Sequence, residues 1–226
     1  MLANGLALVI ERALAELEGG DVREARRHRK ALLLGALRED VARVPLGTRV
    51  FEHLSLSHFG GGRWPGGFLP FWPGPRYKVR RFFRAALAHA RAGVSGAAFV
   101  SLGRACHVLI DMACPAHVHR VIHETDPFEW YVEVHAATLA DARLTPPVPP
   151  PALHDPAALV TSLSAVTRRS RADRTRNVLG RWLRRLRLLR PLPASEIARQ
   201  ARALIPQAAA HVAALIRVFL EARAPR

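Results

Sequence analysis

The middle of this chain reads His107-Val108-Leu109-Ile110-Asp111-Met112-Ala113-Cys114-Pro115-Ala116-His117, an apolar run that carries three residues able to bind a metal. His107 and Asp111 are four positions apart, so on a helix their side chains lie on one face and can reach a single ion. Burying a carboxylate is unfavourable unless a cation or hydrogen bonds compensate for it, and Zn²⁺ accepts imidazole and carboxylate together. Pro115 ends or kinks the helix, which lets His117 approach from the following turn. We therefore expect a metal site here, with a hydrogen-bonded core pair of His107 and Asp111 as the alternative.

Histidines gather in this region, since five of the eleven in the chain fall between His107 and His135. Such clustering is typical of a metal site. Four short motifs, in the same order along the chain, resemble those of the zinc-dependent phospholipase C family, which shares its fold with the single-strand-specific zinc nucleases. The motifs are Gly35-Ala36-Leu37-Arg38-Glu39-Asp40, then His58-Phe59, then Leu102-Gly103 with the His107 to His117 stretch, and finally Glu129-Trp130-Tyr131-Val132.

The resemblance covers roughly residues 6 to 140 and implies an all-α, compact multi-helix bundle that hydrolyses phosphate esters. It implies one zinc ion held by four residues, namely Asp40, His58, His107 and Asp111. A second zinc would take His117 and Glu129, with Asp111 bridging the two ions. The family has a further histidine four positions before the glutamate, where this chain has Thr125, and His123 is our candidate substitute. Asp40 is also the expected catalytic general base.

A third zinc site of the family uses a histidine in the first helix, and this chain has Leu6 at that position. The resemblance therefore implies one to two zinc ions, with phospholipid head groups as the first expected substrate. A single-strand-specific zinc nuclease is the alternative enzyme, although that branch has an aspartate at the position of Glu129. A catalytically silent relative, which keeps zinc and binds anionic membrane, is the alternative from a different class.

Length and composition are those of a globular protein, because 226 residues, half of them hydrophobic, can bury a full core. Apolar residues spaced by three and four predict helices, and no alternating strand pattern stands out. The expected helices span residues 2–17, 25–44, 79–92, 97–113, 129–142, 157–166 and 197–220. We expect a helical core over residues 1–145, a Pro-rich connector over 146–156, and basic C-terminal helices over 157–226 that pack on the core.

The formal net charge of +16 favours an anionic partner. Arg168 to Arg190 carries ten arginines against one acid, Asp173, with Trp182 and several leucines between them. A basic amphipathic helix of this kind can lie on anionic lipid or along nucleic-acid phosphates. The alternative is a solvated face in an arginine-rich chain, which contains only two lysines. The oligomeric state has no signal in the sequence.

The first ten residues lack the basic start of a secretion signal, and no apolar run approaches the ~20 residues of a membrane span. We expect a cytoplasmic protein, or a secreted one if the chain is truncated at its start. Cys106 and Cys114 would lie about 12 Å apart along one helix, too far for a disulfide. Both are therefore expected to be buried thiols.

Overall fold

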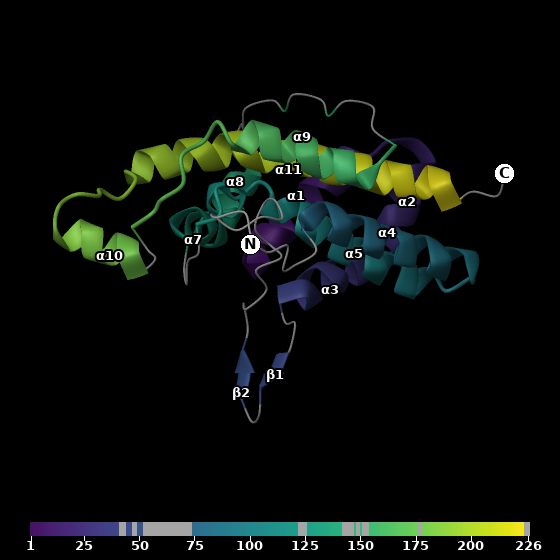
Figure 1. Cartoon of the computed structure of the whole chain (residues 1–226). Coiled ribbons are helices and arrows are strands. Elements are labelled where there is room, and N and C mark those ends of the chain that lie inside the picture. The colour runs from purple at the N-terminus through teal and green to yellow at the C-terminus, as the bar shows by residue number, and fades with distance from the viewer. Residues whose placement is uncertain are drawn as a thin grey trace.

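The structure is a computed structural model that describes residues 1–40, 44–46, 49–51, 74–121, 126–141, 147, 150, 154–175 and 178–223. Within these ranges the fold is built from helices, with one short hairpin (Figure 1). The helices are α1 (Ala3–Ala15), α2 (Gly19–Arg27), α3 (Arg29–Asp40), α4 (Pro75–Arg91), α5 (Ser95–Asp111), α6 (Pro115–Val118), α7 (Pro127–Val134), α8 (Ala136–Asp141), α9 (Pro156–Thr167), α10 (Val178–Arg185) and α11 (Ala194–Arg223). The hairpin pairs β1 (Val44–Leu46) with β2 (Arg49–Phe51), antiparallel, with Pro45 opposite Val50.

Helix α5 is the centre of the bundle. Its side chains are buried at nearly every position from Ala98 to Asp111, so it is covered on all sides rather than on one stripe. It packs against α3 and α4 along their lengths and also against α11. Because α5 ends at Asp111, its last turn carries His107 and Asp111 into the interior of the protein.

Helices α3 and α5 cross in very close contact. The ring of His28, just before α3, stacks on Phe99 with centroids 4.4 Å apart. One turn later, a Cβ atom on Gly103 would lie 2.1 Å from the carbonyl oxygen of Leu32. Asp40 is the last residue of α3, and Asp111 is the last residue of α5.

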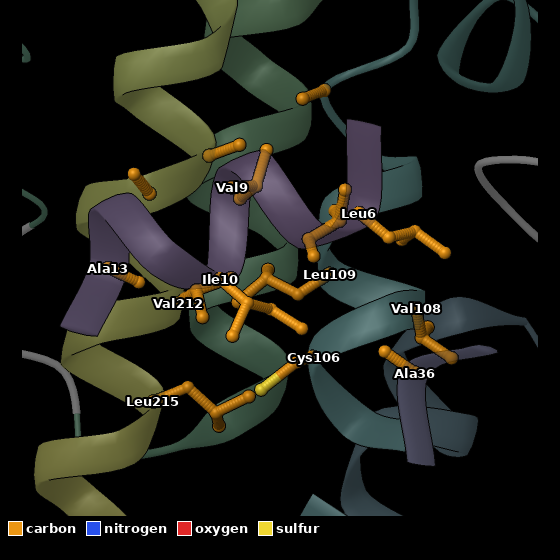
Figure 2. Close-up of a cluster of buried hydrophobic side chains, with 14 of the residues drawn as sticks. Leu6, Val9, Ile10, Ala13, Ala36, Cys106, Val108, Leu109, Val212 and Leu215 are labelled. Carbon is orange, nitrogen blue, oxygen red and sulfur yellow. The ribbon is translucent and has the colours of Figure 1, made fainter. Parts of the chain in front are cut away.

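The hydrophobic core is one cluster to which both ends of the chain contribute. Figure 2 shows Ile10 of α1, Leu109 of α5, and Val212 and Leu215 of α11 pointing toward one another. All four are 0% exposed, and a fully buried leucine or isoleucine stabilises the fold by about 2 kcal/mol. Helices α1 and α11 therefore close over the face of α5 that α3 and α4 leave open.

The all-α prediction is confirmed, although two of the predicted helices are divided and most helix ends are shifted. The predicted helix 25–44 is divided at His28 and ends at Asp40, and the predicted helix 129–142 is divided at His135. The hairpin was not predicted, because strands of three residues are too short for an alternating pattern. Within the basic segment Arg168 to Arg190, the described residues form one helix, α10 (Val178–Arg185). The preceding helix, α9, ends at Thr167, directly before the segment begins.

Helix α11 corrects the expectation that no segment is long and apolar enough to cross a membrane. Its 30 residues meet that test by length and composition. However, 78% of its most apolar window is buried against other helices. This burial is typical of a core helix, which agrees with its contacts to α1, α5, α7 and α9.

Candidate metal centre

The first pair of the candidate site lies at the end of α5. His107 Nε2 lies 3.1 Å from Asp111 Oδ2, and both side chains are 0% exposed. The spacing of four residues on a helix produces this contact. A hydrogen-bonded pair and two ligands of one ion share this geometry, so the surrounding groups decide between them.

Two short helices bring further donors to this pair. The chain turns after Asp111, and Pro115 occupies the first position of α6, where its missing N–H costs nothing. His117 on α6 then places Nδ1 3.6 Å from Asp111 Oδ1 and Nε2 3.6 Å from Glu129 Oε1 on α7. His117 is therefore a bridge between the two carboxylates.

Helix α7 is positioned by its own N-terminal residues. The Asp126 carboxylate accepts hydrogen bonds from the backbone N–H groups of Phe128 (2.9 Å) and Glu129 (3.2 Å), and Pro127 follows it. This is a side-chain N-cap, which typically stabilises a helix by about 1 kcal/mol. The cap fixes the start of α7, and with it the direction in which Glu129 points.

The amino group of Met1 lies inside the same cluster. Its nitrogen is 2.9 Å from Asp111 Oδ1 and 2.8 Å from Glu129 Oε1. Helix α1 is anchored nearby, because the Glu133 carboxylate of α7 accepts hydrogen bonds from the backbone N–H groups of Asn4 and Gly5. The contacts of Met1 show that the two carboxylates form a pocket for positive charge.

The pKa values follow from burial and from these charges. Burial raises the pKa of Glu129, but the Met1 amino group and His117 lower it by more, and the resulting pKa is about 2. Burial and the negative charge of Glu129 raise the pKa of Asp126 to about 7. The cluster thus concentrates buried negative charge, which a bound cation stabilises.

The donor set fits zinc. Imidazole nitrogens and carboxylate oxygens are zinc ligands, and two such atoms on a tetrahedral ion stand about 3.3 Å apart. The contacts of 3.1 Å and 3.6 Å in the cluster are close to this spacing. The residues of this chain are therefore able to hold a metal ion of this kind.

Of the residues predicted for the site, the structure brings four together: His107, Asp111, His117 and Glu129. The description of Asp40 is limited to its backbone at the end of α3. His58 and His123 lie outside the described residues. Leu6 is fully buried in the core, so the position expected for a histidine of a third zinc site is apolar.

One residue of the cluster was not predicted as a donor. Cys114, His117 and Glu129 each offer a ligand atom, and these atoms lie within 4.8 Å of one another. The sequence signal was the position of Cys114, three residues before His117 and directly before Pro115. Its proximity to Glu129 depends on how α6 and α7 pack, which no local pattern reveals.

A surface cavity of about 450 Å³ lies along another face of α7. Trp130, Tyr131 and Val134 line it, together with Asp126 and the start of α11. The four clustered donors do not line this cavity, so it is separate from the candidate metal centre.

The whole fold matches structures of two bacterial toxins. An alpha-toxin of Clostridium perfringens from an avian strain aligns with a TM-score of 0.66 and 15% identity over 98% of this chain. The alpha toxin of Clostridium absonum aligns with a TM-score of 0.69 and 14% identity, also over 98% of this chain. The chain has the fold of the clostridial alpha-toxins.

The alpha-toxin fold is the all-α fold that the resemblance to zinc-dependent phospholipases C implies. The chain spans 62% and 66% of the lengths of the two toxin chains. No protein-family model and no curated protein sequence matches it. At 14–15% identity the likeness shows the fold, and the chemistry must be argued from the cluster itself.

Proposed function

We propose that this protein is a zinc-dependent hydrolase of phosphate esters, of the phospholipase C type. One observation carries the proposal. His107, Asp111, His117 and Glu129 are buried and are joined by a chain of contacts, at the end of the central helix of an alpha-toxin fold and on the two short helices that follow it. Buried imidazoles and carboxylates that are arranged in this way commonly bind metal ions.

The proposed ligands are His107 and Asp111 for one zinc ion, with Asp40 and His58 as further ligands by resemblance, and His117 and Glu129 for a second. Bound zinc supplies Lewis-acid polarisation of a phosphoryl oxygen and makes nearby water more acidic. The protein's own contribution is to hold the carboxylates deprotonated and fixed in direction. The N-cap of Asp126 and the turn at Pro115 support this, since they hold α7 and α6 in place.

Asp40 is proposed as the general base toward the attacking water. Its position at the end of α3 supports this role, because α3 crosses α5, the helix that ends at Asp111, in close contact at Gly35 and Gly103. A general base must lie within hydrogen-bond reach of the proton that it accepts. Changing Asp40 to Asn should therefore lower turnover more than it lowers zinc content.

Phospholipid head groups are the proposed substrate, and α10 is the proposed contact with the lipid surface. Trp182, Leu186 and Leu188 are 57%, 48% and 71% exposed, and exposed apolar side chains that are grouped can mark an interaction surface. Arg184, Arg185 and Arg187 are exposed beside them. Figure 1 shows α10 at one end of the bundle, away from the other helices. Apolar side chains flanked by arginines are typical of a helix that lies in an anionic interface.

The test measures the release of water-soluble phosphate from phospholipid vesicles and of nucleotides from single-stranded DNA, each with added zinc and with a chelator. We expect zinc-dependent hydrolysis of phospholipid, and loss of activity by at least about 100-fold in His107→Gln. His89→Gln is the matched control, because His89 is exposed and lies on α4, which carries none of the clustered donors.

Each other outcome selects a different function. Hydrolysis of single-stranded DNA alone would replace the phospholipase proposal with a zinc nuclease. Zinc-loaded protein that hydrolyses neither substrate would reject both enzymes and leave the silent zinc-binding relative.

A further inference from the structure

Cys114 lies beside His117 and Glu129 in the cluster of possible metal ligands. It is 0% exposed and lies in the turn between α5 and α6, directly before Pro115. Its sulfur, one ring nitrogen of His117 and one carboxylate oxygen of Glu129 lie within 4.8 Å of one another. Thiolate, imidazole and carboxylate are the three side-chain types that zinc accepts most readily.

The distances allow these three groups to share an ion. On a tetrahedral zinc ion with bonds of about 2.0–2.3 Å, the donor atoms stand about 3.3–3.7 Å apart. His117 Nε2 and Glu129 Oε1 are already 3.6 Å apart. Binding the thiol to the same ion would shorten its distances to the other two donor atoms from at most 4.8 Å to about 3.7 Å.

The other contacts of Cys114 do not explain its position. Although it is the N-cap residue of α6, its side chain makes no capping hydrogen bond. Its thiol donates a weak hydrogen bond of 3.7 Å to Asp126 Oδ1, but that oxygen already accepts two backbone N–H groups of α7. Neither helix therefore needs the thiol for its start.

The proposed second zinc site has two ligands from the resemblance, His117 and Glu129, and Thr125 at the position where the family has the third. We propose that Cys114 supplies that third protein ligand, as a thiolate bound to zinc together with His117 and Glu129. Metal binding breaks the S–H bond, the sulfur bonds to zinc, and the proton leaves to solvent. This inference rests on the proposed zinc chemistry, and it replaces His123 as the candidate for the missing ligand.

Cobalt provides a test that is independent of activity, because Co²⁺ occupies zinc sites and a thiolate bound to it gives an ultraviolet charge-transfer band. The protein is freed of metal with a chelator and titrated with Co²⁺ as wild type, Cys114→Ala and Cys106→Ala. The chain has only two cysteines, so a band in Cys106→Ala can come only from Cys114. Cys106 is the matched control, since it is equally buried and its sulfur lies in the apolar core near Leu109 and Leu215 (Figure 2).

We expect the band in the wild type and in Cys106→Ala, and its loss in Cys114→Ala together with metal binding at least about tenfold weaker. Visible cobalt bands without the thiolate band would overturn the role of Cys114 while leaving the zinc centre intact. Failure of the wild type to bind either Co²⁺ or Zn²⁺ would overturn the proposed function as well. Because Cys106→Ala and the wild type decide the matter, the test holds even if Cys114→Ala does not fold.

Discussion

Gly35 and Gly103 face each other where α3 crosses α5, and neither position has room for a Cβ atom. On Gly35 that atom would lie 2.0 Å from the carbonyl oxygen of Val100, and on Gly103 it would lie 2.1 Å from that of Leu32. Both glycines belong to the motifs that also contain Asp40 and His107. The close crossing therefore explains why glycine stands in each motif: it lets α3, which ends at Asp40, touch the backbone of α5, which carries His107 and Asp111.

Gly103→Ala is predicted to force the two helices apart. The added methyl group meets backbone atoms, which cannot rotate away, so the free energy of unfolding should fall by about 3 kcal/mol or more. Zinc affinity should fall too, because α3 carries Asp40. Urea unfolding and zinc titration measure the two effects.

Gly96→Ala on the same helix is the control for this substitution. A Cβ atom there has no neighbour within 4 Å, and alanine favours a helix over glycine by up to about 1 kcal/mol. Its stability should be unchanged or higher. Equal loss in both variants would mean that the close crossing is not what requires glycine.

Asp111→Asn is predicted to remove the stabilisation that zinc confers on the wild type. Asp111 contacts His107, His117 and the amino group of Met1, so its charge is shared by the whole cluster. Zinc at 100 times its dissociation constant should stabilise the wild type by about 2.7 kcal/mol. Melting temperatures with zinc and with a chelator should differ in the wild type and coincide in Asp111→Asn. Asp141→Asn, at an exposed position of α8, should retain the zinc effect.

The sequence predicted the parts of the site that depend on local spacing. The four-residue separation of His107 and Asp111 and the break at Pro115 follow from helix geometry and proline chemistry, and both are found in the structure. The division of the predicted helix 25–44 at His28 has no local signal, because it accompanies the stacking of His28 on Phe99, a residue distant in sequence.

The role proposed for Cys114 shows the same limit within the site. Locally it reads as a small apolar residue before a proline, and only the packing of α6 against α7 brings it near Glu129. The charge of Arg168 to Arg190 was evident from composition. Which of its leucines are exposed depends on where α10 begins and ends.

His211 predicts a dependence of stability on pH. This residue of α11 is 1% exposed; its Nδ1–H donates to the carbonyl oxygen of Gln207 at 2.7 Å, and Nε2 lies 3.1 Å from the hydroxyl of Ser162. Burial lowers the pKa of His211 below its ordinary value. Below about pH 6.5 the unfolded chain therefore takes up a proton that the folded protein does not. The free energy of unfolding then decreases as the pH is lowered, by up to about 1.4 kcal/mol per pH unit.

His211→Gln should remove this contribution. The measurement is the difference in free energy of unfolding between wild type and variant from pH 7 to pH 5, which cancels the titration of other groups. The wild type should lose more stability on acidification than the variant does. Parallel curves would mean that His211 is protonated equally in the folded and unfolded chain.

The arginines of α10 and of the turn that follows it are predicted to govern binding to lipid vesicles. Each arginine near an anionic surface contributes about 1 kcal/mol, so changing Arg184, Arg185 and Arg187 together to Gln should weaken binding on the order of 100-fold. Binding of the wild type should require anionic lipid and weaken steeply as salt is added, because the attraction is screened. Co-sedimentation with vesicles of phosphatidylserine and phosphatidylcholine measures both effects.

Three arginines of α4 provide a control of equal charge for that triple variant. Arg76, Arg81 and Arg84 are exposed, and changing them to Gln lowers the net charge by the same amount without touching α10. Binding that weakens equally in the two variants would assign the affinity to net charge alone and reject α10 as the docking helix. A loss confined to the α10 variant would assign the binding to the arginines of this segment. Weaker binding of Trp182→Ala would show that the exposed apolar side chains also enter the interface, because removing Trp182 leaves the charge unchanged.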